Sequence, residues 1–158
     1  MIRALILALA ALFLASPALA VDFPPLTGRV VDRADLLTAS QEGVLTRELA
    51  ALEQRTGDHV VIVTLSSIGG RPIQAYGRAL FDHWALGEHG ILVLVVLYDN
   101  QVRFEIGSGL SEIVTDAAAQ RIIDRDLLPG LRGSDFYTAI HEAERSLARL
   151  LPAQPVPQ

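Results

Sequence analysis

The feature that most constrains the fold is an uninterrupted apolar run from Ile91 to Leu97. Successive side chains of a strand point to opposite faces of a sheet, so a strand with one wet face alternates apolar and polar residues. A strand that is apolar at every position is covered on both faces, which is typical of the centre of an α/β sheet. We therefore expect a sheet enclosed between two helical layers.

Three further segments have strand patterns. Residues 59–65 are β-branched and apolar, residues 29–32 form a very short strand candidate, and residues 101–106 alternate. Asp99 and Asn100 predict a two-residue hairpin between 91–97 and 101–106. The sheet should therefore have about four strands and be mixed, mostly parallel.

Four helices are expected between and after these strands. Thr38, with Gln41 three residues later, has the pattern of a capping box, and Gly57 should end that helix. The other three are a helix beginning at Pro72, one from Thr115 to about Leu128 that Pro129 and Gly130 should stop, and one over 136–150 that Ser134 or Asp135 should cap. The predicted fold is a three-layer α/β/α sandwich.

The two ends of the chain have patterns of their own. Arg3 precedes an apolar run that Pro17 breaks, and Ala18 to Ala20 are typical of a cleavage site, so residues 1–20 are predicted to be a signal peptide. With cleavage near Ala20 and Val21, the domain would occupy 21–151, and the proline-rich residues 152–158 would be disordered. We expect a periplasmic or secreted monomer without a transmembrane segment in the mature chain.

Composition excludes several classes of function. The chain has no cysteine and no lysine, so a thiolate metal site, a cysteine nucleophile, Schiff-base chemistry and a P-loop lysine are excluded. Its formal charge of −5 argues against nucleic acid as a partner. Gly107 and Gly109 resemble half of a dinucleotide fingerprint, but the third glycine is missing. The chemistry that remains depends on oxygen ligands and arginine.

Five residues are candidates for one metal site. They are carboxylates and a histidine expected at strand ends or turns: Asp32, Glu105, Glu112, Asp116 and His89. Such oxygen-rich groups favour Ca²⁺ or Mg²⁺. Each also has a structural interpretation: Asp116 suits a first helical turn, His89 suits a solvated loop, and Glu105 shares a strand face with Arg103 that we expect to be exposed.

The ordered set of motifs resembles the TPM-domain family. It begins with Phe-Pro-Pro-Leu-Thr-Gly-Arg-Val-Val-Asp at 23–32, and its later parts include Leu-Phe-Asp-His-Trp-Ala-Leu-Gly at 80–87 and Arg-Phe-Glu-Ile-Gly-Ser-Gly-Leu at 103–110. The remaining matches are 36–38, 52–53, 56–57, 115–117, 128–132 and 135–136. Coverage extends from Phe23 to about Leu150.

The resemblance implies an α/β/α sandwich displayed outside the cytoplasm. Members are associated with acid phosphatase activity, with calcium or magnesium binding at an acidic site, with assembly or repair of photosynthetic membrane complexes, or with accessory roles on membrane receptors. This chain departs from the family in its shortened loop at Glu88, His89 and Gly90, and in Ser111, which stands where the family has a glutamate. The family acids that survive are Asp32 and Asp116, with Glu105 beside them.

Two functions are therefore open. The first is an accessory or interaction domain that assists a membrane-associated protein complex. The alternative is a metal-assisted acid phosphatase, in which Asp32 and Asp116 hold the ion and Arg103 or Arg29 offsets the charge of the phosphate. We favour the first, because a catalytic ion site tolerates the loss of ligands poorly.

Overall fold

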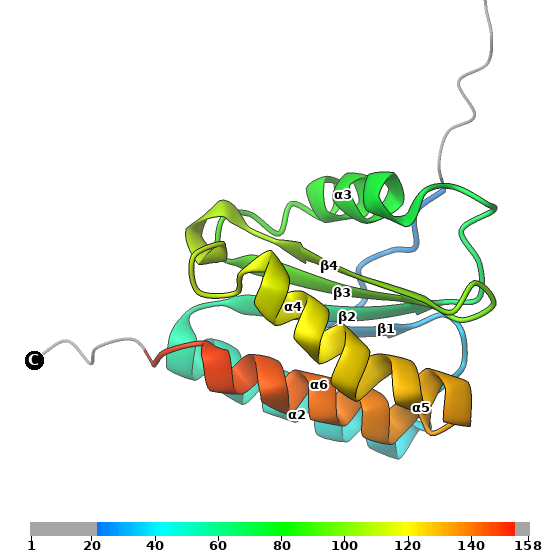
Figure 1. Ribbon diagram of the computed structural model, residues 1–158. Helices are drawn as coiled ribbons and strands as arrows, with labels where there is room; N and C mark the ends of the chain where they lie inside the picture. Colours follow the sequence, from blue (N-terminus) through cyan, green and yellow to red (C-terminus); the bar gives the residue numbers. More distant parts are fainter. Residues whose placement is uncertain (1–21, 154–158) are drawn as a thin grey trace, which may run out of the picture.

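A four-stranded sheet forms the middle layer of the computed structural model, which describes residues 22–153 (Figure 1). Its strands are β1 (Val30–Asp32), β2 (His59–Leu65), β3 (Gly90–Val96) and β4 (Gln101–Ile106), in the spatial order β1-β2-β3-β4. The first three are parallel and β4 is antiparallel to β3. Every residue of β3 is buried, which confirms the predicted central strand. The predicted signal peptide and residues 154–158 of the predicted tail lie outside the described residues.

Helices cover both faces of the sheet, as Figure 1 shows. One face carries α3 (Ile73–His83), and the other carries α2 (Ala39–Thr56), α4 (Asp116–Ile122) and α6 (Phe136–Leu150). This arrangement confirms the predicted α/β fold with a mixed, mostly parallel sheet. Among residues 22–153, no helix combines the length and the apolar composition that a membrane span needs.

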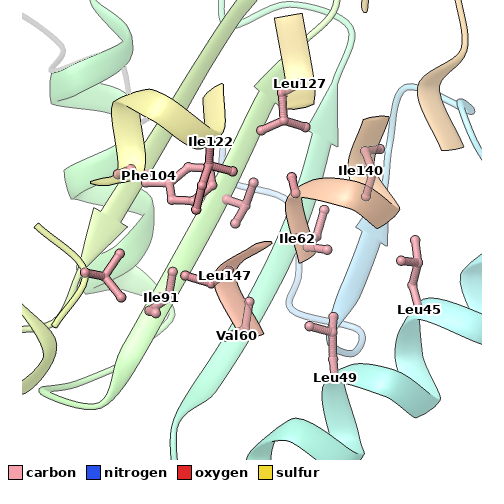
Figure 2. Packing of buried hydrophobic residues seen from close by; sticks show 14 of the residues in the cluster. Leu45, Leu49, Val60, Ile62, Ile91, Phe104, Ile122, Leu127, Ile140 and Leu147 are labelled. Atoms are coloured by element: carbon pink, nitrogen blue, oxygen red, sulfur yellow. The ribbon is translucent and has the colours of Figure 1, made fainter. Parts of the chain in front are cut away.

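The alternation of side chains along β2 divides the apolar core in two. Val60 and Ile62 pack toward α2, α4 and α6, together with residues such as Leu49 and Leu147 (Figure 2). Val61 and Val63 point to the other face and pack against α3. Each fully buried Val, Leu or Ile contributes about 1.5–3 kcal/mol, so both helical layers are held by apolar packing on a single sheet.

The two parallel crossovers have opposite hands. Both connections, β1 to β2 and β2 to β3, step in the same direction across the sheet. Their helices, α2 and α3, nevertheless lie on opposite faces. The hand of a crossover depends on the direction of the step across the sheet and on the face that its helix covers. One of the two crossovers is therefore left-handed, which is rare for parallel strands.

The ends of α2 follow the sequence prediction. The Thr38 hydroxyl accepts from the Gln41 backbone N–H, and the Gln41 side chain accepts from the Thr38 backbone N–H, which is a capping box. Gly57 ends the helix with a positive φ of 77°, a conformation that costs glycine little.

Two boundaries differ from the prediction. The helix that begins at Asp116 does not stop at Pro129: a π-helical turn, η3 (Ile123–Leu127), leads into α5 (Leu128–Gly133). Pro129 lies in the first turn of α5, where a missing N–H is tolerated. The β3–β4 link is also longer than two residues, because Leu97 and Tyr98 donate to the carbonyls of Leu65 and Ser66 instead of pairing with β4.

Candidate functional site

Asp32 lies at the carboxyl end of β1 and organises the loop that leads into α2. Its Oδ2 accepts from the Leu37 backbone N–H at 2.8 Å, and its Oδ1 accepts from the Thr64 hydroxyl. Thr64 Oγ1 in turn accepts from the Ala34 N–H at 3.2 Å. Both oxygens of Asp32 therefore have partners that fix the local backbone, and the carboxylate joins β1, β2 and the start of α2.

The strand face that carries Glu105 is covered, so the prediction that this face is exposed was wrong. Glu105 is buried, and its Oε1 accepts from Arg103 Nε at 2.7 Å, so the two residues share a face as predicted. That face lies under α3, where Gly77 leaves the space that the glutamate fills. A Cβ built on Gly77 would approach Glu105 Oε1 to 3.3 Å. The glycine of a neighbouring helix, which strand alternation cannot reveal, explains the burial.

Asp116 shares a hollow with the Arg103–Glu105 pair. It is the first residue of α4 and is exposed, and the N-cap of that helix is Thr115. Asp116, Glu105 and Arg103 all line a hollow of about 520 Å³ at the β4 edge. Two of the five predicted metal ligands are thus brought to one place, with a guanidinium beside them.

His89 and Glu112 lie elsewhere. His89 is exposed and precedes β3, and its Nδ1 lies 3.0 Å from Oδ1 of the buried Asp58, which precedes β2. This pair is at the amino ends of the parallel strands, whereas Asp32 is at the carboxyl end of β1. Glu112 is exposed in the turn before α4 and does not line the hollow of Asp116. Within residues 22–153, no three of the five predicted ligands bring their donor atoms within 4.8 Å of one another.

A different trio does meet that condition: Glu48 of α2 with His141 and Glu144 of α6. His141 Nε2 lies 2.9 Å from Glu48 Oε2, and the ring of Tyr137 stacks on the imidazole at a centroid distance of 5.3 Å. Glu144 is buried, and this desolvation, followed by the charge of Glu48, raises its pKa above the ordinary value.

None of the three residues of this group was a predicted metal ligand. His141 is not among the five predicted ligands, and its side chain is only 23% exposed. The signal in the sequence was the spacing of His141 and Glu144, three residues apart. This spacing puts both residues on one face of the helix, and the other residues of that face are apolar. The third member, Glu48, comes from α2, and the contact between α2 and α6 cannot be read from the spacing of either helix.

Comparisons with known proteins agree with this fold. The sequence model of the TPM domain matches residues 30–150. The N-terminal domain of a P. gingivalis protein, solved by NMR, is 31% identical with a TM-score of 0.74, over 79% of this chain and 82% of that one. No curated protein sequence matches the chain.

Two more distant structures share the fold alone. The N-terminal domain of the cg2496 protein of Corynebacterium glutamicum has 16% identity and a TM-score of 0.65, over 89% of this chain and 90% of that one. The BA42 protein of the psychrophilic bacterium Bizionia argentinensis has 17% identity and a TM-score of 0.60, over 75% and 86%. The match over residues 30–150 and the P. gingivalis relative together show that this chain belongs to the TPM domain family.

Proposed function

We propose that this protein is an exported accessory domain that docks on a membrane-associated protein complex. The observation that carries the proposal is Tyr98, which is 75% exposed at the β3–β4 turn. Every other Phe, Tyr or Trp side chain within residues 22–153 is buried or half-buried. Exposed Tyr is enriched among the residues that dominate binding energy at protein interfaces.

Hydrogen bonds hold the backbone that carries this ring. Tyr98 N donates to the Ser66 carbonyl at 3.0 Å, and Asn100 N donates to the Leu97 carbonyl at 3.1 Å. Binding at a turn whose backbone is already held costs less conformational entropy than binding at a mobile loop. Asn100 and Gln101, two and three residues after Tyr98, line a polar hollow of about 510 Å³ together with Arg71. An aromatic anchor beside polar groups is the usual anatomy of a protein interface.

The test compares capture of partners from detergent-solubilised membranes by the wild-type protein, Tyr98→Ala and Leu150→Ala. Leu150 is also an exposed apolar residue, but it is the last residue of α6. Tyr98→Ala should reduce the affinity for the recovered partner by 10-fold or more, because loss of an aromatic anchor costs about 2 kcal/mol. Leu150→Ala should keep the partner. Equal recovery by all three proteins would contradict the proposal.

The metal-assisted phosphatase is the second candidate, and the hollow at the β4 edge favours it. Asp116 and Glu105 would offer oxygen ligands there and Arg103 a phosphate contact. Asp32 has no place in this version, because it ends β1, at the edge of the sheet opposite to β4. Magnesium-dependent phosphatase activity should then disappear in Asp116→Asn and persist in Asp124→Asn, a change to another exposed α4-region aspartate. Activity that survives Asp116→Asn would remove this candidate.

A further inference from the structure

The trio Glu48, His141 and Glu144 lies in the helical layer, away from the Tyr98 turn and from the hollow of Asp116. Glu48 is on α2, and in the sequence it lies between the buried residues Leu45 and Leu49. His141 and Glu144 are three residues apart on α6, on the face turned toward α2. One ligand atom from each of the three lies within 4.8 Å of the other two.

The polar atoms of this trio have an unusual property, since they are buried and near one another without being hydrogen-bonded. Glu48 Oε2 and His141 Nε2 are both buried and lie 2.9 Å apart, within ion-pair distance for a protonated imidazole, but the two atoms do not form a hydrogen bond with each other or with any other described group. Glu144 is 7% exposed, and among the described residues no ion pair or side-chain hydrogen bond involves its carboxylate. Buried polar groups without partners are rare in folded proteins, because each costs free energy comparable to a lost hydrogen bond.

Shared coordination of a metal ion would satisfy these atoms together. Two ligand atoms that each lie about 2.0–2.2 Å from one ion are separated by roughly 2.9–3.5 Å, depending on the coordination angle. The separation of Glu48 Oε2 and His141 Nε2 falls at the short end of that range. The lone pairs of such ligands point at the ion and not at each other, which agrees with close atoms that form no hydrogen bond.

Charge leads to the same conclusion. Two carboxylates and a neutral imidazole carry a charge of −2, which a divalent cation neutralises. Without an ion, burial and the nearby charge of Glu48 together raise the pKa of Glu144, although the cationic groups around it offset part of this effect. The other charged groups around it are His141, Arg145 and Arg55.

We propose that Glu48, His141 and Glu144 bind a divalent first-row transition-metal ion, of which Zn²⁺ is the representative. An imidazole ligand suits Zn²⁺ and its neighbours, whereas Ca²⁺ and Mg²⁺ take oxygen ligands almost alone. Tyr137, stacked on the imidazole, holds the ring in place for coordination. Glu48 and Glu144 also line a shallow groove of about 830 Å³ between α2 and α6, which lets an ion enter and leaves room for water to complete the coordination shell.

The test is a Zn²⁺ titration of the purified full chain at neutral pH, followed by calorimetry and by the midpoint of thermal unfolding. The wild-type protein should bind one Zn²⁺ and unfold at a higher temperature with it. Glu144→Gln, His141→Gln and Glu48→Gln should each weaken binding by at least 10-fold. Glu142→Gln and His83→Gln change exposed residues on α6 and α3, and both should bind like the wild type.

A second readout separates a metal site from a purely structural ion cluster. In chelator-treated protein, Glu144→Gln should raise the unfolding midpoint, because it removes a buried carboxylate without a partner, while the same variant loses the response to Zn²⁺. A Glu144→Gln protein that is less stable without metal would overturn the proposal, and so would Zn²⁺ binding that is unchanged in this variant. No binding to the wild type up to millimolar Zn²⁺ would also overturn it. Displacement of Zn²⁺ by equimolar Ca²⁺ would overturn the choice of a transition metal.

Discussion

Glu105 and Glu144 are buried to nearly the same extent, at 6% and 7% exposure, but the charged groups next to them differ. Glu105 lies under α3 with the Arg103 guanidinium 2.7 Å away. Glu144 lies between α2 and α6, near the carboxylate of Glu48 and without a hydrogen-bonded partner among the described residues. Burial alone therefore does not identify a functional carboxylate: a paired one stabilises the fold, and an unpaired one is free to take a ligand.

The largest effect should come from removing the partner of Glu105. Arg103→Ala leaves a buried carboxylate without its cation, which costs about 3–5 kcal/mol in a fully buried pair. Arg103 is 39% exposed, so solvent screening lowers the expected loss of unfolding free energy to about 2 kcal/mol. Urea unfolding measures it, and Arg78→Ala, which breaks an exposed pair with Asp82, is the matched control. If both variants unfold at the same urea concentration, the Arg103–Glu105 pair does not stabilise the fold.

Removing the charge of Glu144 should raise stability, whereas removing the partner of Glu105 lowers it. Burial raises the pKa of Glu144, so the folded state binds this proton more tightly than the unfolded state. The stability of the metal-free protein should therefore fall as pH rises above the ordinary pKa of 4.5.

Glu144→Gln removes that dependence. At pH 8 it should raise the unfolding free energy by about 1 kcal/mol, the scale of a typical single substitution. Urea titrations at pH 4 and pH 8 in the presence of a chelator measure the difference. An equal effect at both pH values would contradict the assignment to Glu144.

Asp126 supplies a third carboxylate, whose cation, Arg125, is 66% exposed and therefore well screened by solvent. The Arg125 hydrogen bond, at 2.6 Å, is the main cause that lowers the Asp126 pKa, and Ser146 adds to it. The stabilisation by this pair is present above the ordinary pKa of 3.8. It is lost as pH falls through the lower pKa that Asp126 has in the folded protein. Asp126→Asn should cost about 0.5 kcal/mol at neutral pH, as screened surface pairs do. Acid unfolding should then be less steep, and Asp124→Asn, which changes an exposed neighbour, should leave the acid profile unaltered.

Local signals predicted most of the fold. The apolar run at Ile91 to Leu97 indicated the central strand, and Thr38 with Gln41 indicated the start of α2, because each depends on neighbours in the chain. The stop expected at Pro129 was wrong, because proline fits the first turn of α5 after a π-helical turn. Composition does not reveal where such a wider turn occurs.

The candidate sites were harder to predict, because they depend on which elements face each other. Asp32 and Asp116 were singled out correctly as residues at element ends, but the sheet order places them apart. The burial of Glu105 depends on Gly77 in α3, and the position of Glu144 depends on α2. Both contacts join residues far apart in the sequence, and no local pattern encodes them.

The packing of the segment before β1 has a practical consequence. The indole N–H of Trp84, the one tryptophan of the chain, donates to the Pro24 carbonyl at 3.0 Å, and Phe23 packs against Tyr76 and His83. The emission spectrum of this protein is therefore a built-in optical reporter of whether residues 23–24 are docked on α3. A red shift that precedes the loss of helical circular dichroism would show that this segment detaches before the sandwich melts.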